Sequence, residues 1–178
     1  MEIDYQDDAA FTSGTAEPWL NTFIKVLRTK LPSHLIVCTV SAGYFSGWAV
    51  YTKGGFLNVH KQRGDKIDFY NVRYFDQGDS TFNTAATLFT KSTGWAVKTS
   101  VKELIDKGIP SEKIVIGKPA TSADTSAPAS YMSPSALSTA ISEGSSAHGW
   151  KTGVMIYQLS SDLNGSIMKQ VVQPIVSA

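Results

Sequence analysis

Five short apolar runs along the chain predict buried strands. In the first run Ile3 and Tyr5 fall on one face while Glu2, Asp4 and Gln6 fall on the other, because successive strand side chains alternate between faces. Continuous or β-branched apolar sequence predicts four more strands, at residues 35–40, 66–75, 114–118 and 153–157.

Segments of helical periodicity separate these strands. Apolar residues recur every three or four positions from Leu20 to Leu31, which predicts a helix from Pro18 to the residue before Pro32. Similar signals predict helices at residues 56–62, 80–90, 100–107, 134–144 and 166–172. Strands that alternate with helices are typical of an α/β protein with a parallel sheet. We therefore expect a single domain over residues 1–178.

Polar and aromatic residues gather directly after each predicted strand. They occupy residues 6–8, 41–45, 73–77, 118–124 and 157–162. Functional sites of parallel sheets and of TIM barrels form at the carboxyl ends of the strands, so this edge is the expected site. The three polar side chains of the first strand need partners there, since a buried unpaired polar group costs about 1–3 kcal/mol. The alternative is an exposed, frayed end with solvated charges.

Composition and charge exclude several classes of function. The formal net charge is +1 and no basic stripe is present, so we expect no nucleic-acid partner. No apolar run approaches the roughly 18 residues that span a membrane, and we expect no membrane partner. Cys38 is predicted to pack in the core. The start of the chain lacks a secretory signal pattern and falls inside a strand pattern, which suggests a processed, cut or truncated product; Met1 is equally consistent with a deliberate or natural short reading frame.

Four segments in chain order, at residues 2–6, 71–77, 115–120 and 153–158, carry motifs that resemble those of a known family. That family is glycoside hydrolase family 18, the chitinases and endo-β-N-acetylglucosaminidases, in a fungal-type form. Residues 2–6 resemble the end of the fourth-strand signature Asp-Gly-x-Asp-x-Asp-x-Glu, and residues 71–77 the sixth-strand Asn-x-Gln-Phe/Tyr-Tyr-Asn-Gln. Residues 115–120 are similar to the seventh-strand Gly-x-Pro-Ala, and residues 153–158 to the eighth-strand Gly-Val-Met-x-Trp-Gln.

The resemblance implies a partial TIM (β/α)8 barrel, comprising strands four to eight with their helices. A complete barrel usually needs about 250 residues. Five strands would leave open edges, which natural sheets normally hide. The chain would then pair with a second copy as a homodimer, fold as a compact half barrel, or be a fragment. Members of the family are usually secreted.

The resemblance also implies a degenerate catalytic site. Gln6 stands at the position of the acid that protonates the leaving group, and Asp4 at that of the residue that orients the N-acetyl group. Phe75 replaces a tyrosine that bonds the acetyl group, and Asp76 replaces an asparagine. An amide cannot act as a general acid, a role worth about 10²–10⁴-fold in rate. We therefore expect a protein with little or no hydrolytic activity, in which Asp7 or Asp8 is a poor substitute for the missing acid.

Aromatic side chains at the strand ends are candidates for stacking on sugar faces. They are Tyr44, Phe45, Trp48, Tyr74, Phe75 and Tyr157, and the alternative is that half of them belong to the core. Glu2, Arg73 and Gln158 complete the expected binding residues, with Arg73 in place of a glutamine and Tyr157 in place of a tryptophan.

We expect no cofactor and no metal, because Glu2, Asp4, Asp76 and Asp162 show no ligand spacing typical of Ca²⁺ or Mg²⁺ loops. Three functions stay open. The first is a chitinase-like protein that binds glycans containing N-acetylglucosamine without cleaving them. The second is a protein-binding or self-associating module, and the third is a weakly active glycosidase acting on chitin or N-glycan cores.

Overall fold

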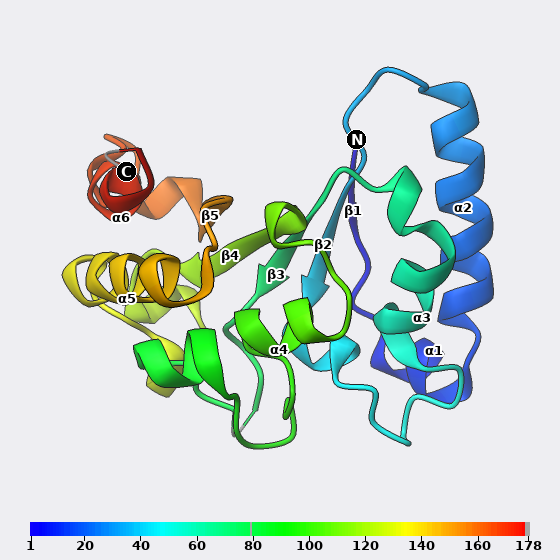
Figure 1. Ribbon diagram of the computed structural model, residues 1–178, viewed down its shortest axis with the longest axis horizontal. Helices are drawn as coiled ribbons and strands as arrows, with labels where there is room; N and C mark the ends of the chain where they lie inside the picture. The colour runs from blue at the N-terminus through cyan, green and yellow to red at the C-terminus, as the bar shows by residue number, and fades with distance from the viewer. Residues whose placement is uncertain (79, 177–178) are drawn as a thin grey trace.

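A five-stranded parallel sheet forms the centre of the protein in the computed structural model, which describes residues 1–78 and 80–176 (Figure 1). The order β1-β2-β3-β4-β5 follows the chain, so each strand pairs with the next strand in sequence. The strands are β1 (Glu2–Asp4), β2 (Val37–Ser41), β3 (Phe69–Arg73), β4 (Ile114–Pro119) and β5 (Gly153–Tyr157). The predicted α/β class and parallel sheet are confirmed.

Helices follow the strands and cover one face of the sheet. They are α1 (Asp8–Ser13), α2 (Ala16–Lys30), α3 (Gly55–Arg63), α4 (Val101–Asp106), α5 (Pro134–His148) and α6 (Ser166–Val176). Figure 1 shows α2 and α3 beside the β1 half of the sheet and α5 and α6 beside the β5 half. Side chains such as Cys38, Val40, Val72 and Ile116 fill the core between the sheet and these helices.

The predicted helix at residues 80–90 is wrong for most of its length. Only one π-helical turn, Ala86–Thr90, forms there. The side chains of Thr84 and Thr87 accept hydrogen bonds from each other's backbone N–H groups, both at 3.1 Å. This reciprocal pair is the arrangement of a capping box, which starts the helical turn at Thr84 and leaves residues 80–83 outside it. Apolar spacing alone does not reveal such a cap.

Helix α1 is absent from the sequence prediction because its six residues are too few for a periodic pattern. Its boundaries are nevertheless chemically marked. Asp7 Oδ1 accepts the N–H of Ala10 at 2.9 Å as the N-cap, and Gly14 ends the helix with φ of 74°. The segment at residues 42–55, which follows β2, begins with a buried 3₁₀ turn, Ala42–Phe45.

Lys118 on β4 is fully buried on the helix-covered side of the sheet. Its Nζ donates to the carbonyl oxygens of Tyr74, Phe82 and Ser130 at 3.0, 3.0 and 2.6 Å. Burial lowers the pKa of this lysine to about 7. The side chain therefore ties the exit of β3 and two loops to the sheet.

The sheet is open, because β1 pairs only with β2 and β5 pairs only with β4. The helix-free face carries the polar side chains that alternate with the core residues, among them Glu2, Thr39 and Asn71. Among the described residues, no helix is long and apolar enough to cross a membrane.

Candidate functional site at the carboxyl edge of the sheet

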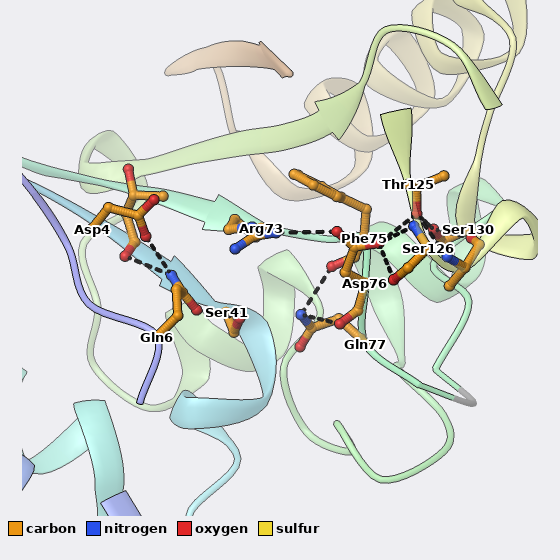
Figure 2. A network of polar contacts seen from close by, with 12 residues as sticks. Asp4, Gln6, Ser41, Arg73, Phe75, Asp76, Gln77, Thr125, Ser126 and Ser130 are labelled. Atoms are coloured by element: carbon orange, nitrogen blue, oxygen red, sulfur yellow. Dashed lines mark hydrogen bonds and ion pairs between the residues drawn. The ribbon is translucent and has the colours of Figure 1, made fainter. Parts of the chain in front are cut away.

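Gln6 is held by three hydrogen bonds just beyond the end of β1 (Figure 2). Its Nε2 donates to Asp4 Oδ1 at 2.9 Å and to the carbonyl oxygen of Thr39 at 3.1 Å. Its Oε1 accepts the hydroxyl of Ser41 at 2.6 Å. Both ends of the amide are thus used, which fixes its orientation. The group beside Asp4 can donate a hydrogen bond but has no acidic proton to transfer.

A second layer of polar side chains begins at Glu2, two residues before Asp4 on β1 and on the same face of the sheet. Glu2 Oε1 accepts the hydroxyl of Thr39 and the Nδ2 of Asn71, the latter at 3.0 Å. The register places Asp4 beside Thr39 and Thr39 beside Asn71, so these side chains share one face of adjacent strands. The first strand is therefore paired with β2 and is not frayed, but it lies at the edge of the sheet and Glu2 and Asp4 are exposed, as the alternative expected.

Asp76 anchors the loop that follows β4 to the exit of β3. Its Oδ1 accepts the hydroxyl of Thr125 and both the N–H and the hydroxyl of Ser126, at 2.7, 2.7 and 2.8 Å, while its Oδ2 lies 3.1 Å from Arg73 Nη2 (Figure 2). Burial opposes ionisation of Asp76, but the hydrogen bonds from Thr125 and Ser126, together with the charge of Arg73, hold its pKa below the usual value. Asp76 thus positions a loop at this edge.

Phe75, Arg73 and Tyr157 stack on one another across the sheet. The ring centroids of Phe75 and Tyr157 lie 5.7 Å apart with an interplanar angle of 29°, and the guanidinium of Arg73 lies 4.7 Å from the centroid of Phe75. Phe75 is fully buried, whereas Tyr157 is 44% exposed. Tyr157 thus presents an aromatic surface on a fixed support. The neighbouring Gln158 donates from Nε2 to Asp124 Oδ1 at 3.2 Å.

Three of the six aromatic residues expected to stack on sugars belong to the core instead. Tyr44, Phe45 and Tyr74 are at most 2% exposed and lie on the helix side of the sheet. Tyr44 packs against Phe11 with ring centroids 4.2 Å apart, and burial raises its pKa. These side chains cannot reach a sugar, so the prediction is wrong for them, and the alternative that half of the set is core holds.

Phe75 is also closed to solvent and can only support Tyr157. Of the six aromatics, Trp48 and Tyr157 are exposed, each by 44%. The structure therefore reduces the aromatic part of the candidate site to these two residues.

Several residues of this edge carried no clear signal in the sequence. Thr125 and Ser126 lie in a Ser/Thr-rich loop whose partner, Asp76, lies 49 residues away from Thr125. Trp95 lies in irregular sequence, and its indole N–H donates to the carbonyl oxygen of Gln77. Asn71 belongs to a recognised motif, but its bond to Glu2 reaches from β3 across β2 to β1. Only pairing of distant segments brings these groups together.

The acidic residues considered as metal ligands serve other roles. Asp162 accepts the N–H groups of Ile167 and Met168 at 3.0 and 2.9 Å and so caps the start of α6. In the part of the chain that the structure describes, no three His, Cys, Asp or Glu side chains lie close enough together to hold a metal ion.

The fold is similar to that of solved chitinases. No protein-family model matches the sequence, and no curated protein matches it. A GH18 chitinase from Pseudoalteromonas aurantia superposes with a TM-score of 0.79 at 23% identity, over 97% of this chain and 60% of that one. A fungal endo-β-N-acetylglucosaminidase of glycosyl hydrolase family 18 gives a TM-score of 0.65 at 16% identity, over 98% of this chain and 54% of that one.

A third solved structure is a class V chitinase from Nicotiana tobaccum, a mutant with glutamine in place of a glutamate, in complex with NAG4. It gives a TM-score of 0.64 at 13% identity, over 98% of this chain and 67% of that one. The chain thus spans about 60% of the first of these proteins. The protein has the fold of part of the barrel found in glycoside hydrolase family 18 chitinases.

Proposed function

We propose that the protein is a member of glycoside hydrolase family 18 that binds glycans containing N-acetylglucosamine and does not cleave them. The observation that carries this proposal is the side-chain amide of Gln6, whose orientation three hydrogen bonds fix. It stands beside Asp4, at the position where the family's mechanism needs a carboxylic acid to donate a proton. A related fold that carries glutamine in place of a glutamate still binds a glycan, as the NAG4 complex of the Nicotiana tobaccum mutant illustrates.

The two acids that follow Gln6 lie at the start of α1 and not on the strand. Asp7 caps α1 through Ala10 N–H. Asp8 lies in the first turn of the same helix and accepts the hydroxyl of Tyr44. Both residues thus belong to the structure of α1. This argues against the weakly active glycosidase.

The exposed ring of Tyr157 is the proposed sugar platform. Its support by Phe75 and Arg73 reduces the conformational freedom that would be lost on binding. Stacking on such a ring is expected to contribute about 0.5–1.5 kcal/mol beyond the burial of apolar area. Asp4 and Arg73 supply a hydrogen-bond acceptor and a donor at the same edge of the sheet.

A calorimetric titration with a chitooligosaccharide tests this proposal. The unmodified chain is expected to show saturable binding, and Tyr157→Ala to weaken it about 3- to 10-fold. Leu163→Ala is a suitable control because Leu163 is 81% exposed and makes no part of the platform. Absence of binding at millimolar ligand would remove glycan binding from the proposal.

Activity provides a second test with a fluorogenic chitobioside. The unmodified chain is expected to give no turnover. We expect the double variant Gln6→Glu with Phe75→Tyr to remain inactive as well, because Phe75 is fully buried under Tyr157 and the sheet is open at both edges. Substantial hydrolysis by this variant would contradict the reasoning.

A second candidate function is self-association or protein binding through the β5 edge. Every residue of β5 is at least partly exposed, and Leu159 and Leu163 beside it are 77% and 81% exposed. Such an edge can pair with another strand. Sedimentation equilibrium decides between the states, and a strict monomer over the micromolar range would exclude a homodimer at those concentrations.

A further inference from the structure

A cavity of about 360 Å³ lies where α3 and α4 lead back into the sheet. Its lining comes from the end of α3 and the turn after it, from residues 107–110 after α4, and from Lys113 directly before β4. The amino ends of β3 and β4 follow these segments. The cavity therefore lies toward the edge of the sheet opposite Gln6, and it shares no residue with the candidate glycan site.

Three lysines line this cavity. They are Lys61, Lys107 and Lys113, and within the part of the chain that the structure describes none of them forms an ion pair with a carboxylate. Asp65 also lies on the lining, but it pairs with Lys66 at 2.8 Å. Three positive charges and one negative charge give the lining a formal net charge of +2. Such a cavity repels cations and attracts an anion.

Two of these ammonium groups are held in place by backbone carbonyl oxygens. Lys107 Nζ donates to the carbonyl oxygens of residues 45–46 at 2.6 and 3.0 Å. Lys113 Nζ donates to those of Gly64 and Ile67, both at 2.6 Å. An ammonium group has three N–H donors, so these bonds leave one donor of each lysine for a ligand. Because both side chains are already ordered, little conformational entropy is lost when a ligand binds.

His60 lines the same cavity and is sensitive to its charge. Its Nδ1 lies 2.7 Å from the hydroxyl oxygen of Tyr70, and its Nε2 lies 3.3 Å from the carbonyl oxygen of Gly108. Burial lowers the pKa of His60, the contact with Gly108 opposes this shift, and the charge of Lys113 lowers the pKa further. The imidazole is therefore a natural reporter of any anion that binds beside Lys113.

We propose that this cavity is an anion-binding site that takes a phosphate group, either as free phosphate or as part of a small phosphomonoester. Lysine binds phosphate as a point charge, and three lysines face the cavity. The volume of about 360 Å³ falls in the range of about 300–1,000 Å³ that is typical of small-molecule pockets, so there is room for a group attached to the phosphate. This site is independent of the proposed glycan binding, because the two share no residue.

An NMR titration with inorganic phosphate at pH 7 tests this inference, with sodium chloride as the balancing salt so that the ionic strength stays constant. The Cε1–H resonance of His60 is expected to shift saturably, with a dissociation constant of roughly 1 mM. The pKa of His60 should rise as phosphate binds, because the anion offsets the charge of Lys113. Sodium chloride alone should produce neither change.

A parallel titration with glycerol phosphate distinguishes the two sources of the phosphate group. Tighter binding of glycerol phosphate than of inorganic phosphate would assign the site to a phosphomonoester. Equal or weaker binding would assign it to free phosphate.

Lys61→Met is the most direct variant. Lys61 is exposed, and in the described part of the chain it is not tied to a backbone carbonyl as Lys107 and Lys113 are. Loss of one unit charge about 4 Å from the anion should weaken phosphate binding about fivefold. Asp65→Asn should strengthen binding about twofold, because it removes a negative charge from the lining. Lys151→Met is the matched control, since Lys151 is also exposed and lies outside the cavity.

Three results would overturn the phosphate site. The first is the absence of a saturable shift of the His60 resonance up to about 20 times the expected dissociation constant. The second is an equal loss of affinity in Lys61→Met and in Lys151→Met, which would show that phosphate responds to net charge alone. The third is a shift of the same size with sodium chloride. None of these results bears on glycan binding, which the chitooligosaccharide titration tests separately.

Discussion

Replacement of Gln6 by glutamate tests how the exit of β1 is built. The amide Nε2 lies 2.9 Å from Asp4 Oδ1 and 3.1 Å from the carbonyl oxygen of Thr39. In Gln6→Glu a carboxylate oxygen replaces this donor. The new carboxylate then faces the carboxylate of Asp4, and the carbonyl oxygen of Thr39 loses its hydrogen-bond donor. At the observed 2.9 Å, two unit charges repel by roughly 1.4 kcal/mol in water and by roughly 6 kcal/mol at an effective dielectric constant of 20. Because Asp4 is exposed, we expect a loss of unfolding free energy of about 2 kcal/mol at pH 8.

The pH dependence of this loss identifies its cause. A repulsion of about 2 kcal/mol raises the pKa of the introduced carboxyl by about 1.5 from its usual 4.3 or so. The native state then binds the proton more tightly than the unfolded state does. The charge penalty is therefore absent below about pH 4, grows as the pH rises to about 6, and stays constant above that.

Urea unfolding of the unmodified chain and the variant at pH 4.5 and pH 8 measures this difference. Gln6→Met is the control, because it removes the same hydrogen bonds without adding a charge, and its deficit should be the same at both pH values. An equal deficit for Gln6→Glu at the two pH values would refute the proposed contact between the Gln6 side chain and Asp4.

Two further predictions concern buried and loop-anchoring charges. Lys118→Met leaves three carbonyl oxygens without their donor and is expected to lower the unfolding free energy by about 3 kcal/mol at pH 7. The native pKa of Lys118 is lowered to about 7, so above that pH the unfolded state binds more protons than the native state does. The free energy of unfolding of the unmodified chain should therefore rise from pH 7 to about pH 10. The free energy of unfolding of Lys118→Met, measured by urea denaturation, should not show this rise. Asp76→Asn is expected to cost about 1–2 kcal/mol at pH 7 and to speed hydrogen exchange at the N–H of Ser126, which Asp76 accepts. Since the native pKa of Asp76 is lowered, this cost should disappear as the pH falls through and below that pKa, and a cost that persists at pH 2 would contradict the assignment.

The sheet could be predicted from sequence because its signals are local. The apolar runs around Cys38, Ile116 and Met155 are short, continuous and bounded by turn residues, which is typical of buried parallel strands. The helix expected at residues 80–90 was wrong for its first half because the hydroxyls of Thr84 and Thr87 cap the turn and so set its start at Thr84, which apolar spacing does not show.

The site could be predicted only in part, because residue type does not determine which face of the sheet a side chain occupies. Arg73 and Phe75 lie on the helix-free face, whereas Tyr74 between them enters the core. Two adjacent aromatic residues after a strand, Tyr74 and Phe75, therefore look alike in sequence and differ in role. Trp95 stayed hidden because its position depends on Gly43, 52 positions earlier in the sequence, and on a carbonyl group.

The strands lie in the sheet in the same order as they follow one another along the chain, and this affects how the protein folds. Each pairing joins segments that are next to each other in sequence, at separations of roughly 30 to 45 residues, for which the entropy of loop closure grows only slowly with length. No strand has to wait for a partner from the far end of the chain. Folding can therefore begin at any adjacent pair and spread along the sheet. The edge strands β1 and β5, each paired on one side, should be the first to exchange their amide hydrogens.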